Sequence, residues 1–302
     1  MVAHGSAPTL HVGVPMWAQR AWVGRFFPVD TRPGGELAAY SRFLDAVEGN
    51  TTFYASPSPS MVAKWAANTS PGFEFTFKLP RTITHERRLR DAEGPMRTFL
   101  DLMTPLADRI GAMTVQLPAS FGPTDLGVLG AFVGRLSTAW RWCVEVRHPA
   151  FFAGAPGAAL DRLLARHGVE RVVFDTTTLF AAPPTSPAER VAWEKKPRVP
   201  VRYEALTDRP IVRYLGRDDL DSTVAGWAPW VPVVAGWIAE GRRPTCFVHT
   251  PDDLASPGLA RNFHAAVAAL VPSLAPLPEP PGVGDATPVQ VEPAGPEQAS
   301  LF

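Results

Sequence analysis

Short apolar runs rich in β-branched and aromatic residues recur along most of the chain. Eight of them have the length and composition of buried strands, and they lie at residues 10–15, 43–49, 73–78, 110–117, 141–146, 171–175, 211–215 and 245–249. Segments with helical spacing separate most of these runs; Met96, Phe99, Leu100 and Met103, for example, fall on one helix face. Alternating strands and helices pair in parallel through right-handed crossovers. The pattern therefore predicts an α/β fold, a single (β/α)₈ TIM-type barrel over residues 10–271.

A doubly wound open sheet is the structural alternative. That fold usually carries a glycine-rich phosphate-binding turn after its first strand. Here the turn reads Val14-Pro15-Met16-Trp17, which cannot cradle a pyrophosphate. The irregular stretch at 176–210 is expected to be a long loop that contains at most a short helix near 188–195.

Composition indicates which partners and which cellular location to expect for this barrel. The chain has 302 residues, 46% of them hydrophobic, and a formal net charge of zero, which argues against a broad electrostatic grip on nucleic acid. Its two cysteines lie in apolar runs and are expected to be buried thiols. No signal peptide or membrane-length apolar run is visible, so we expect a cytoplasmic, monomeric protein without membrane contact.

Polar residues gather where the predicted strands end, which is where TIM-type barrels place their reacting groups. Catalytic roles are expected for residues with acid–base or ligating side chains: His85, Glu145, His148, Asp175 and His249. Substrate contacts are expected from eight others: Trp17, Asn50, Thr52, Tyr54, Lys78, Gln116, Arg147 and Arg213.

Glu145 and Arg147 are the most informative pair. They alternate with Val144 and Val146, so they share one face of a strand. Buried charges at that spacing pair with each other or with neighbouring strands, because an isolated buried charge is too costly. The pair is either part of the site or part of a salt-bridged ring that fixes the register of the barrel.

The cofactor is left open by the sequence. The five candidate catalytic residues are of the types that bind divalent metals in hydrolytic barrels, but none of them shares a tight ligand spacing such as HExxH. Acid–base catalysis without a metal uses the same residue types. Basic residues after the third strand and in the long loop would suit a phosphate or a nucleic-acid strand if they converge, and are otherwise a solvated face; they are Arg81, Arg87, Arg88, Arg90, Lys195, Lys196, Arg198 and Arg202.

Several motifs, which occur in the same order along the chain, resemble those of the YecE-like family, a bacterial group with a domain-of-unknown-function label. They include Val47-Glu48-Gly49-Asn50-Thr51-Thr52-Phe53-Tyr54, Gln116-Leu117-Pro118-Ala119-Ser120-Phe121-Gly122-Pro123 and Val144-Glu145-Val146-Arg147-His148-Pro149. The resemblance spans roughly residues 10–270 and implies a TIM-type barrel. It supplies no reaction.

The end of the chain carries a separate signal. Residues 272–302 are proline-rich and lack periodic apolar positions, so we expect a disordered tether. Its last five residues, Gln298 to Phe302, resemble the bacterial sliding-clamp-binding pentapeptide, in which Gln298, Leu301 and Phe302 would be the anchors. A terminus without a partner is the alternative.

These observations together predict a DNA-maintenance accessory tethered to the sliding clamp, which hydrolyses a nucleic-acid or nucleotide-derived phosphoester. Two alternatives remain. One is a metabolic isomerase or lyase acting on a phosphorylated small molecule, and the other is a barrel that binds a ligand without catalysis.

Overall fold

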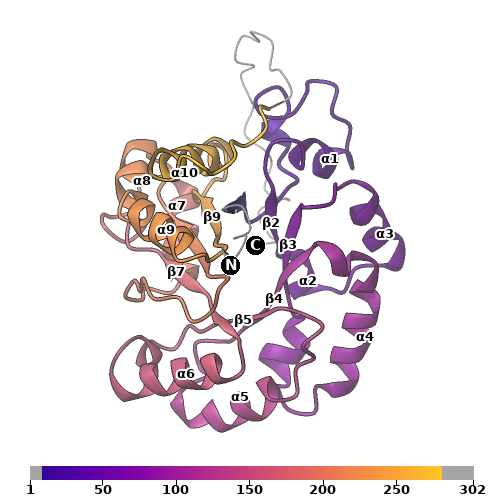
Figure 1. Cartoon of the computed structure of the whole chain (residues 1–302), viewed down its shortest axis with the longest axis vertical. Helices are drawn as coiled ribbons and strands as arrows, with labels where there is room; N and C mark the ends of the chain where they lie inside the picture. The colour runs from indigo at the N-terminus through magenta and orange to yellow at the C-terminus, as the bar shows by residue number, and fades with distance from the viewer. Residues whose placement is uncertain (1–8, 281–302) are drawn as a thin grey trace, which may run out of the picture.

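Nine parallel strands form one curved sheet surrounded by helices (Figure 1). The computed structural model describes residues 9–280. The strand order is β6-β5-β4-β3-β2-β1-β9-β8-β7. β6 and β7 are separated by Val172 alone, and they are two halves of the sixth predicted strand. The sheet thus curls round until its two edge strands meet in one stretch of chain, and the predicted eight-unit barrel is confirmed.

The strands lie close to their predicted positions. Their bounds are β1 His11–Val14, β2 Ala46–Gly49, β3 Glu74–Lys78, β4 Ile110–Gln116, β5 Trp142–Glu145, β6 Glu170–Arg171, β7 Val173–Asp175, β8 Ile211–Leu215 and β9 Thr245–His249. The last two agree with the prediction residue for residue.

Ten α-helices are assigned between residues 9 and 280. They are α1 Glu36–Tyr40, α2 Thr51–Tyr54, α3 Pro59–Ala67, α4 Glu93–Met103, α5 Leu126–Val133, α6 Gly154–Arg166, α7 Pro187–Lys195, α8 Leu220–Trp227, α9 Trp230–Ala239 and α10 Ser256–Leu270. Short 3-10 or π turns lie at Arg20–Trp22, Thr82–Glu86, Thr104–Arg109, Pro123–Asp125 and Pro149–Phe152.

Two helices show how local chemistry sets the boundaries. The helix expected within the long loop is α7, which begins at Pro187 after Ser186, whose hydroxyl accepts from Glu189 N. The apolar residues from Trp227 to Ile238 have the spacing of one helix, but the structure divides them between two, α8 and α9. Pro229 lies between them, and a proline ring clashes with the preceding turn and offers no N–H.

The barrel interior is built in layers, because alternate residues of each strand point inward. One layer is apolar and consists of five strand residues and Val172, which lies between β6 and β7; the six are Ala46, Ala112, Cys143, Val172, Ile211 and Phe247. The outward-facing residues, such as Val47, Val115 and Val144, belong to a larger core between the sheet and the helices. Both cysteines are buried free thiols, as predicted.

Charged residues close the amino-terminal end of the barrel, below the apolar layer. His11 Nδ1 lies 3.4 Å from Asp45 Oδ2, and His11 Nε2 lies 3.6 Å from Glu74 Oε1. Arg209 pairs with Glu74, and Arg141 Nη1 donates to Gly111 O at 2.8 Å. Burial favours the neutral imidazole, but the negative charges of Asp45 and Glu74 outweigh it and raise the pKa of His11.

The chain beyond α10 continues along the barrel surface. Leu274 is buried, and Arg261 Nη1 donates to Pro278 O at 2.5 Å and to Phe43 O at 3.1 Å. The first part of the predicted tether, up to Pro280, therefore packs against the barrel. Every helix between residues 9 and 280 is too short or too polar to cross a membrane.

The raised pKa of His11 predicts a pH-dependent contribution to stability. A group whose pKa rises on folding stabilises the fold at pH values below its unfolded pKa, about 6.5 for histidine, and loses that contribution as pH rises through the folded pKa. We expect His11→Gln to lower the free energy of unfolding more at about pH 5.5 than at about pH 8.5. Urea titrations of both proteins at the two pH values measure this difference, and an equal loss at both would contradict it.

Candidate functional site

A group of buried charged side chains occupies the carboxyl end of the barrel. Glu48 is 1% exposed, Lys78 5%, Glu145 0% and Arg213 3%, on β2, β3, β5 and β8 respectively. Glu48, Glu145 and Arg213 each follow a member of the apolar layer by two residues, so strand alternation places their side chains directly above it.

Arg213 joins the two carboxylates. Its Nε lies 2.8 Å from Glu48 Oε1, and its Nη1 donates to Glu145 Oε2 at 3.1 Å. Arg147 approaches Glu145 from the other side, with Nε and Nη2 donating to Oε1 at 3.0 and 2.9 Å. Lys78 Nζ is 3.9 Å from Glu48 Oε2. The two acids are thus held by three cations.

These contacts keep both acids ionised although they are buried. Burial by itself would raise the pKa of Glu145, but Arg147, Lys78 and Arg213 hold it well below its usual range. Burial likewise opposes ionisation of Glu48, and Arg213 and Lys78 again lower its pKa. Because both carboxylates stay charged, they partly offset the cations around them.

A fourth cation comes from the long loop. Lys196 follows the last residue of α7, is half-buried, and forms no ion pair with any carboxylate between residues 9 and 280. Burial, followed by the charges of Arg213 and Arg147, lowers its pKa to about 8. We call the six charged residues at this end of the barrel the mouth cluster: Glu48, Lys78, Glu145, Arg147, Lys196 and Arg213.

Polar neighbours fix the walls of the mouth cluster. Asn50 Nδ2 donates to Glu48 Oε2 at 3.0 Å and to Pro15 O at 2.9 Å. Thr52 Oγ1 donates to Lys78 O at 2.7 Å, which ties β2 to β3 at the level of the lysine. Gln116, at the end of β4, pairs in register with Glu145.

The two aromatic residues expected to contact substrate lie further out. Trp17 packs edge-on against Trp65 and Phe75, in contact with the outer core. Tyr54 is half-exposed and contacts Phe53 edge-on. Neither aromatic residue forms an ion pair or hydrogen bond that ties it to the mouth cluster in the described part of the chain.

Two predicted catalytic histidines lie beside the mouth cluster. Burial, then the charges of Arg147 and Arg81, lowers the pKa of His85 to about 4, so its imidazole is neutral. Burial also lowers the pKa of His249, against the opposing effect of Asp253. His249 Nδ1 lies 3.5 Å from Asp253 Oδ1, and its buried Nε2 has no hydrogen-bond partner in the described chain.

His148 and Asp175 are placed elsewhere. His148 Nδ1 accepts from Ala150 N at 3.2 Å and so caps a short 3-10 turn. Asp175 Oδ2 accepts from Trp230 Nε1 at 2.7 Å and Oδ1 from Thr177 N at 2.9 Å. His148 thus caps a local turn, whereas Asp175 holds an indole 55 residues away in the chain, and both are out of phase with the inward-facing Glu145 and Phe174.

The five residues considered as metal ligands do not come together as one set. Between residues 9 and 280, no three His, Cys, Asp or Glu side chains are grouped as metal ligands. Glu145 is occupied by Arg147 and Arg213, and Asp175 by Trp230. The five candidate metal ligands therefore do not form one metal site in the described part of the chain.

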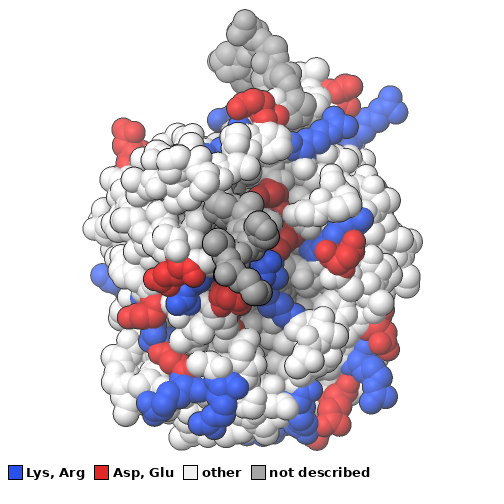
Figure 2. Space-filling view, in the orientation of Figure 1, with Lys and Arg blue, Asp and Glu red and all other residues white. Residues whose placement is uncertain are grey.

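Most of the basic loop residues also remain apart from the mouth cluster. Arg88 pairs with Asp125 at 2.8 Å, and Arg202 with Asp161 at 2.7 Å. Charges of both signs are interspersed over the face shown in Figure 2. Of the loop cations considered for phosphate binding, Lys196 is the one whose charge acts directly on Arg147 and Arg213.

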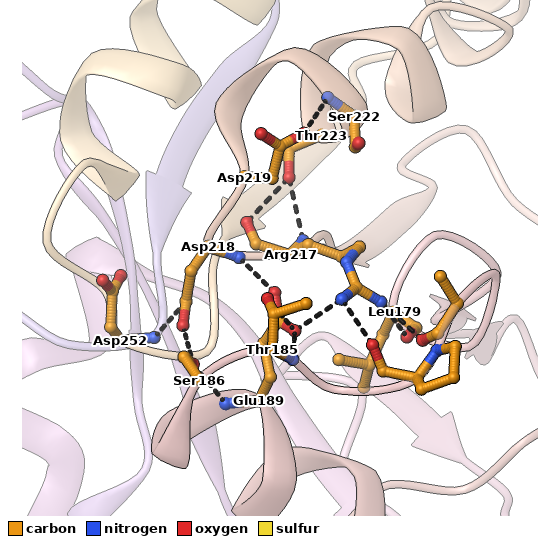
Figure 3. Close-up of polar contacts among 12 residues, drawn as sticks. Leu179, Thr185, Ser186, Glu189, Arg217, Asp218, Asp219, Ser222, Thr223 and Asp252 are labelled. Atoms are coloured by element: carbon orange, nitrogen blue, oxygen red, sulfur yellow. Dashed lines mark hydrogen bonds and ion pairs between the residues drawn. The ribbon is translucent and has the colours of Figure 1, made fainter.

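A buried ion pair holds the loop that carries Lys196 (Figure 3). Glu189 of α7 is 0% exposed, and its carboxylate accepts from Arg217 Nη2 at 2.6 Å, from Thr185 N at 2.7 Å and from Asp218 N at 3.0 Å. Arg217 also donates to the carbonyl oxygens of Ala182 and Pro183 at 2.6 and 2.8 Å. The segment after β8 therefore anchors the segment after β7.

The same network reaches the segment after β9. Asp218 accepts from the Ser186 hydroxyl at the start of α7, and from Asp252 N at 3.0 Å (Figure 3). Three consecutive loops at the carboxyl end are thus linked by side chains, and this linkage fixes the base from which Lys196 projects.

Comparison with known proteins places this barrel among its relatives. The family model described as "Protein of unknown function DUF72" matches residues 11–282. The chain belongs to the DUF72 family. It is 38% identical over 295 residues to the UPF0759 protein YecE of Escherichia coli strain K12, covering 97% of this chain and 100% of that protein. The corresponding protein of Escherichia coli O157:H7 is 37% identical over the same length.

Solved structures of other DUF72 proteins share the fold. A family member from Enterococcus faecalis V583 has a TM-score of 0.63 at 17% identity, covering 89% of this chain and 99% of that one. A member from Thermotoga maritima MSB8 has a TM-score of 0.61 at 20% identity, covering 87% and 99%. At such identities the likeness concerns the fold.

Three residues at the carboxyl end were not singled out from the sequence. Glu48 could have been found by the alternation that selected Glu145, since it shares a strand face with Ala46. Asp253 could have been suspected from its spacing of four residues after His249. Lys196 was seen only as one of many loop cations, because its position depends on the fold of the long loop. The predicted clamp anchors Gln298, Leu301 and Phe302 lie outside the described residues.

The Arg217–Glu189 pair gives a stability prediction. Arg217→Met leaves a fully buried carboxylate without its cation, so we expect the free energy of unfolding to fall by about 3–5 kcal/mol. Arg135→Met is the matched control, since Arg135 and Glu93 form an exposed ion pair and its loss should cost at most about 1 kcal/mol. Chemical denaturation of the three proteins decides the matter; equal losses would show that the buried pair is not important for stability.

Proposed function

We propose that the mouth cluster binds the phosphate or carboxylate group of a small anionic molecule. The observation that carries this proposal is a charge count. Four cations, Lys78, Arg147, Lys196 and Arg213, surround two ionised carboxylates, Glu48 and Glu145. Within this largely buried cluster the cations exceed the carboxylates by two, and Asp253, whose charge also acts on Lys196, offsets part of that excess.

An anion is the ligand that relieves this imbalance. Burial, then the charge of Arg213, lowers the pKa of Lys78 to about 8, which shows that its ammonium form is poorly compensated. A bound dianion would add the missing negative charge, and guanidinium groups are suited to phosphate and carboxylate oxygens. A cation or an uncharged apolar ligand would gain nothing from this arrangement.

Groups for acid–base chemistry stand beside the proposed anion site. His85 and His249 have lowered pKa values, so near neutral pH each imidazole is neutral and has one unprotonated ring nitrogen. Asp253 lies against His249 Nδ1 and would leave Nε2 as the proton acceptor. This favours an enzyme that moves protons on an anionic metabolite, an isomerase or lyase, over a nuclease with a broad basic face. A phosphoester hydrolase would use the same anion site.

Direct titration tests the anion site. We expect calorimetry at low ionic strength to detect binding of pyrophosphate or citrate, weakened at least about tenfold in Lys78→Met, because one charge-assisted contact contributes about 1.5–3 kcal/mol. Lys64→Met, which removes an exposed lysine, is the control and should bind as the unaltered protein does. Absence of binding by the unaltered protein, or equal binding by both variants, would refute the proposal.

Tethering to the sliding clamp is a second, independent proposal. It rests on the pentapeptide Gln298 to Phe302, in which two large apolar residues end a proline-rich segment. A flexible linker of some 20 residues has a reach of about 25 Å, which would raise the effective concentration of the barrel beside clamp-encircled DNA.

Calorimetry with the purified bacterial sliding clamp tests the tether. We expect micromolar binding by the full chain and its loss in the Leu301→Ala/Phe302→Ala double variant, because both apolar anchors would be removed. Anion binding at the mouth cluster serves as the control and should not change. If the clamp does not bind the full chain, the tail has no tethering role.

A further inference from the structure

The distribution of lysine in this chain is uneven. Of 29 basic residues only four are lysines, and the remaining 25 are arginines. Lys64 and Lys195 are exposed. The other two, Lys78 and Lys196, both belong to the mouth cluster. Half of the lysines therefore lie in one buried site of a protein that otherwise uses arginine.

Arginine and lysine differ in one chemical respect that matters in such a site. A guanidinium stays protonated in proteins and serves as a permanent cation, whereas a buried ammonium can lose its proton and become a nucleophilic amine. Either side chain can hold an anion, but only lysine can also supply a neutral amine in such a site. The presence of lysine at position 78 suggests that a neutral amine is used there.

The surroundings of Lys78 suit a nucleophile. Its backbone is fixed, since its carbonyl accepts from Thr52 Oγ1 at 2.7 Å and the next amide, Leu79 N, donates to Thr114 O at 2.9 Å. Its side chain points into the barrel, where desolvation and the charge of Arg213 favour the neutral form. Glu48 Oε2, 3.9 Å from Nζ, is close enough to receive a proton through a small shift or one water molecule.

We propose that Lys78 Nζ forms an imine with a carbonyl group of the anionic substrate. This deepens the proposed function and rests on it, because the phosphate or carboxylate held by the arginines brings the carbonyl carbon to the amine. The substrate class is thereby narrowed to aldehydes or ketones that carry a phosphate or carboxylate.

The reaction balances without a further reagent. The lone pair of the neutral amine attacks the carbonyl carbon, and a C–N bond forms as the C=O π electrons move to oxygen. That oxygen takes up two protons, one from the nitrogen by way of Glu48 and one from solvent, and leaves as water. The resulting iminium accepts the electron pair of a C–H or C–C bond broken beside it, which gives an enamine and releases a proton to a neighbouring neutral histidine or a carbonyl fragment. Protonation of the enamine carbon restores the iminium, and water then hydrolyses it to product and the free amine.

Lys196 is less suited to this step. It follows the end of α7 on a loop rather than lying on a strand, is only half-buried, and forms no ion pair with a described carboxylate that could carry its proton. Its unpaired charge is better used to hold the anionic group of the substrate. Lys78 is thus the nucleophile, and Lys196 contacts the anionic group of the substrate.

Reductive trapping tests the inference. The full-length protein is incubated at about pH 7 with glyoxylate, the smallest aldehyde with a carboxylate, and sodium cyanoborohydride, and labelled peptides are quantified by mass spectrometry. At this pH an amine of pKa about 8 has about 200-fold more of its neutral form than an ordinary lysine, so we expect Lys78 to be labelled about 200-fold faster than Lys64. The rate should rise with pH and level off above about 8.

Lys78→Arg is the matched variant, because it keeps the positive charge and removes the nucleophile. We expect it to bind pyrophosphate, within about threefold of the unaltered protein, and to lose the rapid label. Labelling that proceeds equally at all four lysines, or at least as fast at Lys196 as at Lys78, overturns the inference, because Lys196 also has a pKa of about 8. Pyrophosphate binding without rapid labelling of Lys78 also overturns it but leaves the anion site standing, whereas failure of both removes the proposed function as well. The labelling pattern of the unaltered protein decides the question even if the variant does not fold.

Discussion

The carboxyl end of this barrel depends on one guanidinium. Arg213 enters from β8 and contacts Glu48 of β2 with one nitrogen and Glu145 of β5 with another. Without it, two carboxylates would face each other in a space almost closed to water, and the desolvation cost of each would be uncompensated. Each of these acids also has a second cation beside it, since Arg147 pairs with Glu145 and Lys78 lies 3.9 Å from Glu48. With Lys196, the cations of the mouth cluster outnumber its two carboxylates.

The two ends of the barrel interior show contrasting solutions to the burial of charge. At the amino-terminal end, His11, Arg209 and Arg141 are set against Asp45, Glu74 and backbone carbonyls, and the charges compensate one another locally. At the carboxyl end, cations outnumber acids and lie near neutral histidines. A layer of small apolar side chains separates the two ends. The chemistry that the family fold can host is therefore expected at the end where compensation is incomplete.

Sequence periodicity was sufficient for the architecture, because each strand of a barrel covered by helices must be apolar over a short run whatever lies around it. It placed β8 and β9 to the residue. Strand alternation also placed Glu145 and Arg147 on one face, where the structure pairs them. The same reasoning could not decide which candidates share a site. His148 and Asp175 lie near their strand ends like the other candidates, yet each is one residue out of phase with the inward face. His148 bonds to Ala150 N and Asp175 to the indole of Trp230. The position of Lys196 depends on contacts between residues more than 20 positions apart in the chain, such as the ion pair of Glu189 with Arg217. A local sequence pattern does not reveal such contacts.

The division of the sixth strand at Val172 has a mechanical consequence. Among the described strands, β6 pairs only with β5 and β7 pairs only with β8. The barrel wall therefore has a seam at Val172, where the backbone hydrogen bonds of the sixth strand pass from one neighbouring strand to the other. Glu145 and Arg213 stand on the two strands that flank this seam, and their ion pair spans it. The Arg213–Glu145 ion pair of the mouth cluster thus also connects β8 to β5 across this break in the sheet. Any change that drew Arg213 away from Glu145 would remove the side-chain contact across this line, so the charge arrangement of the mouth cluster and the closure of the barrel wall depend on the same side chain.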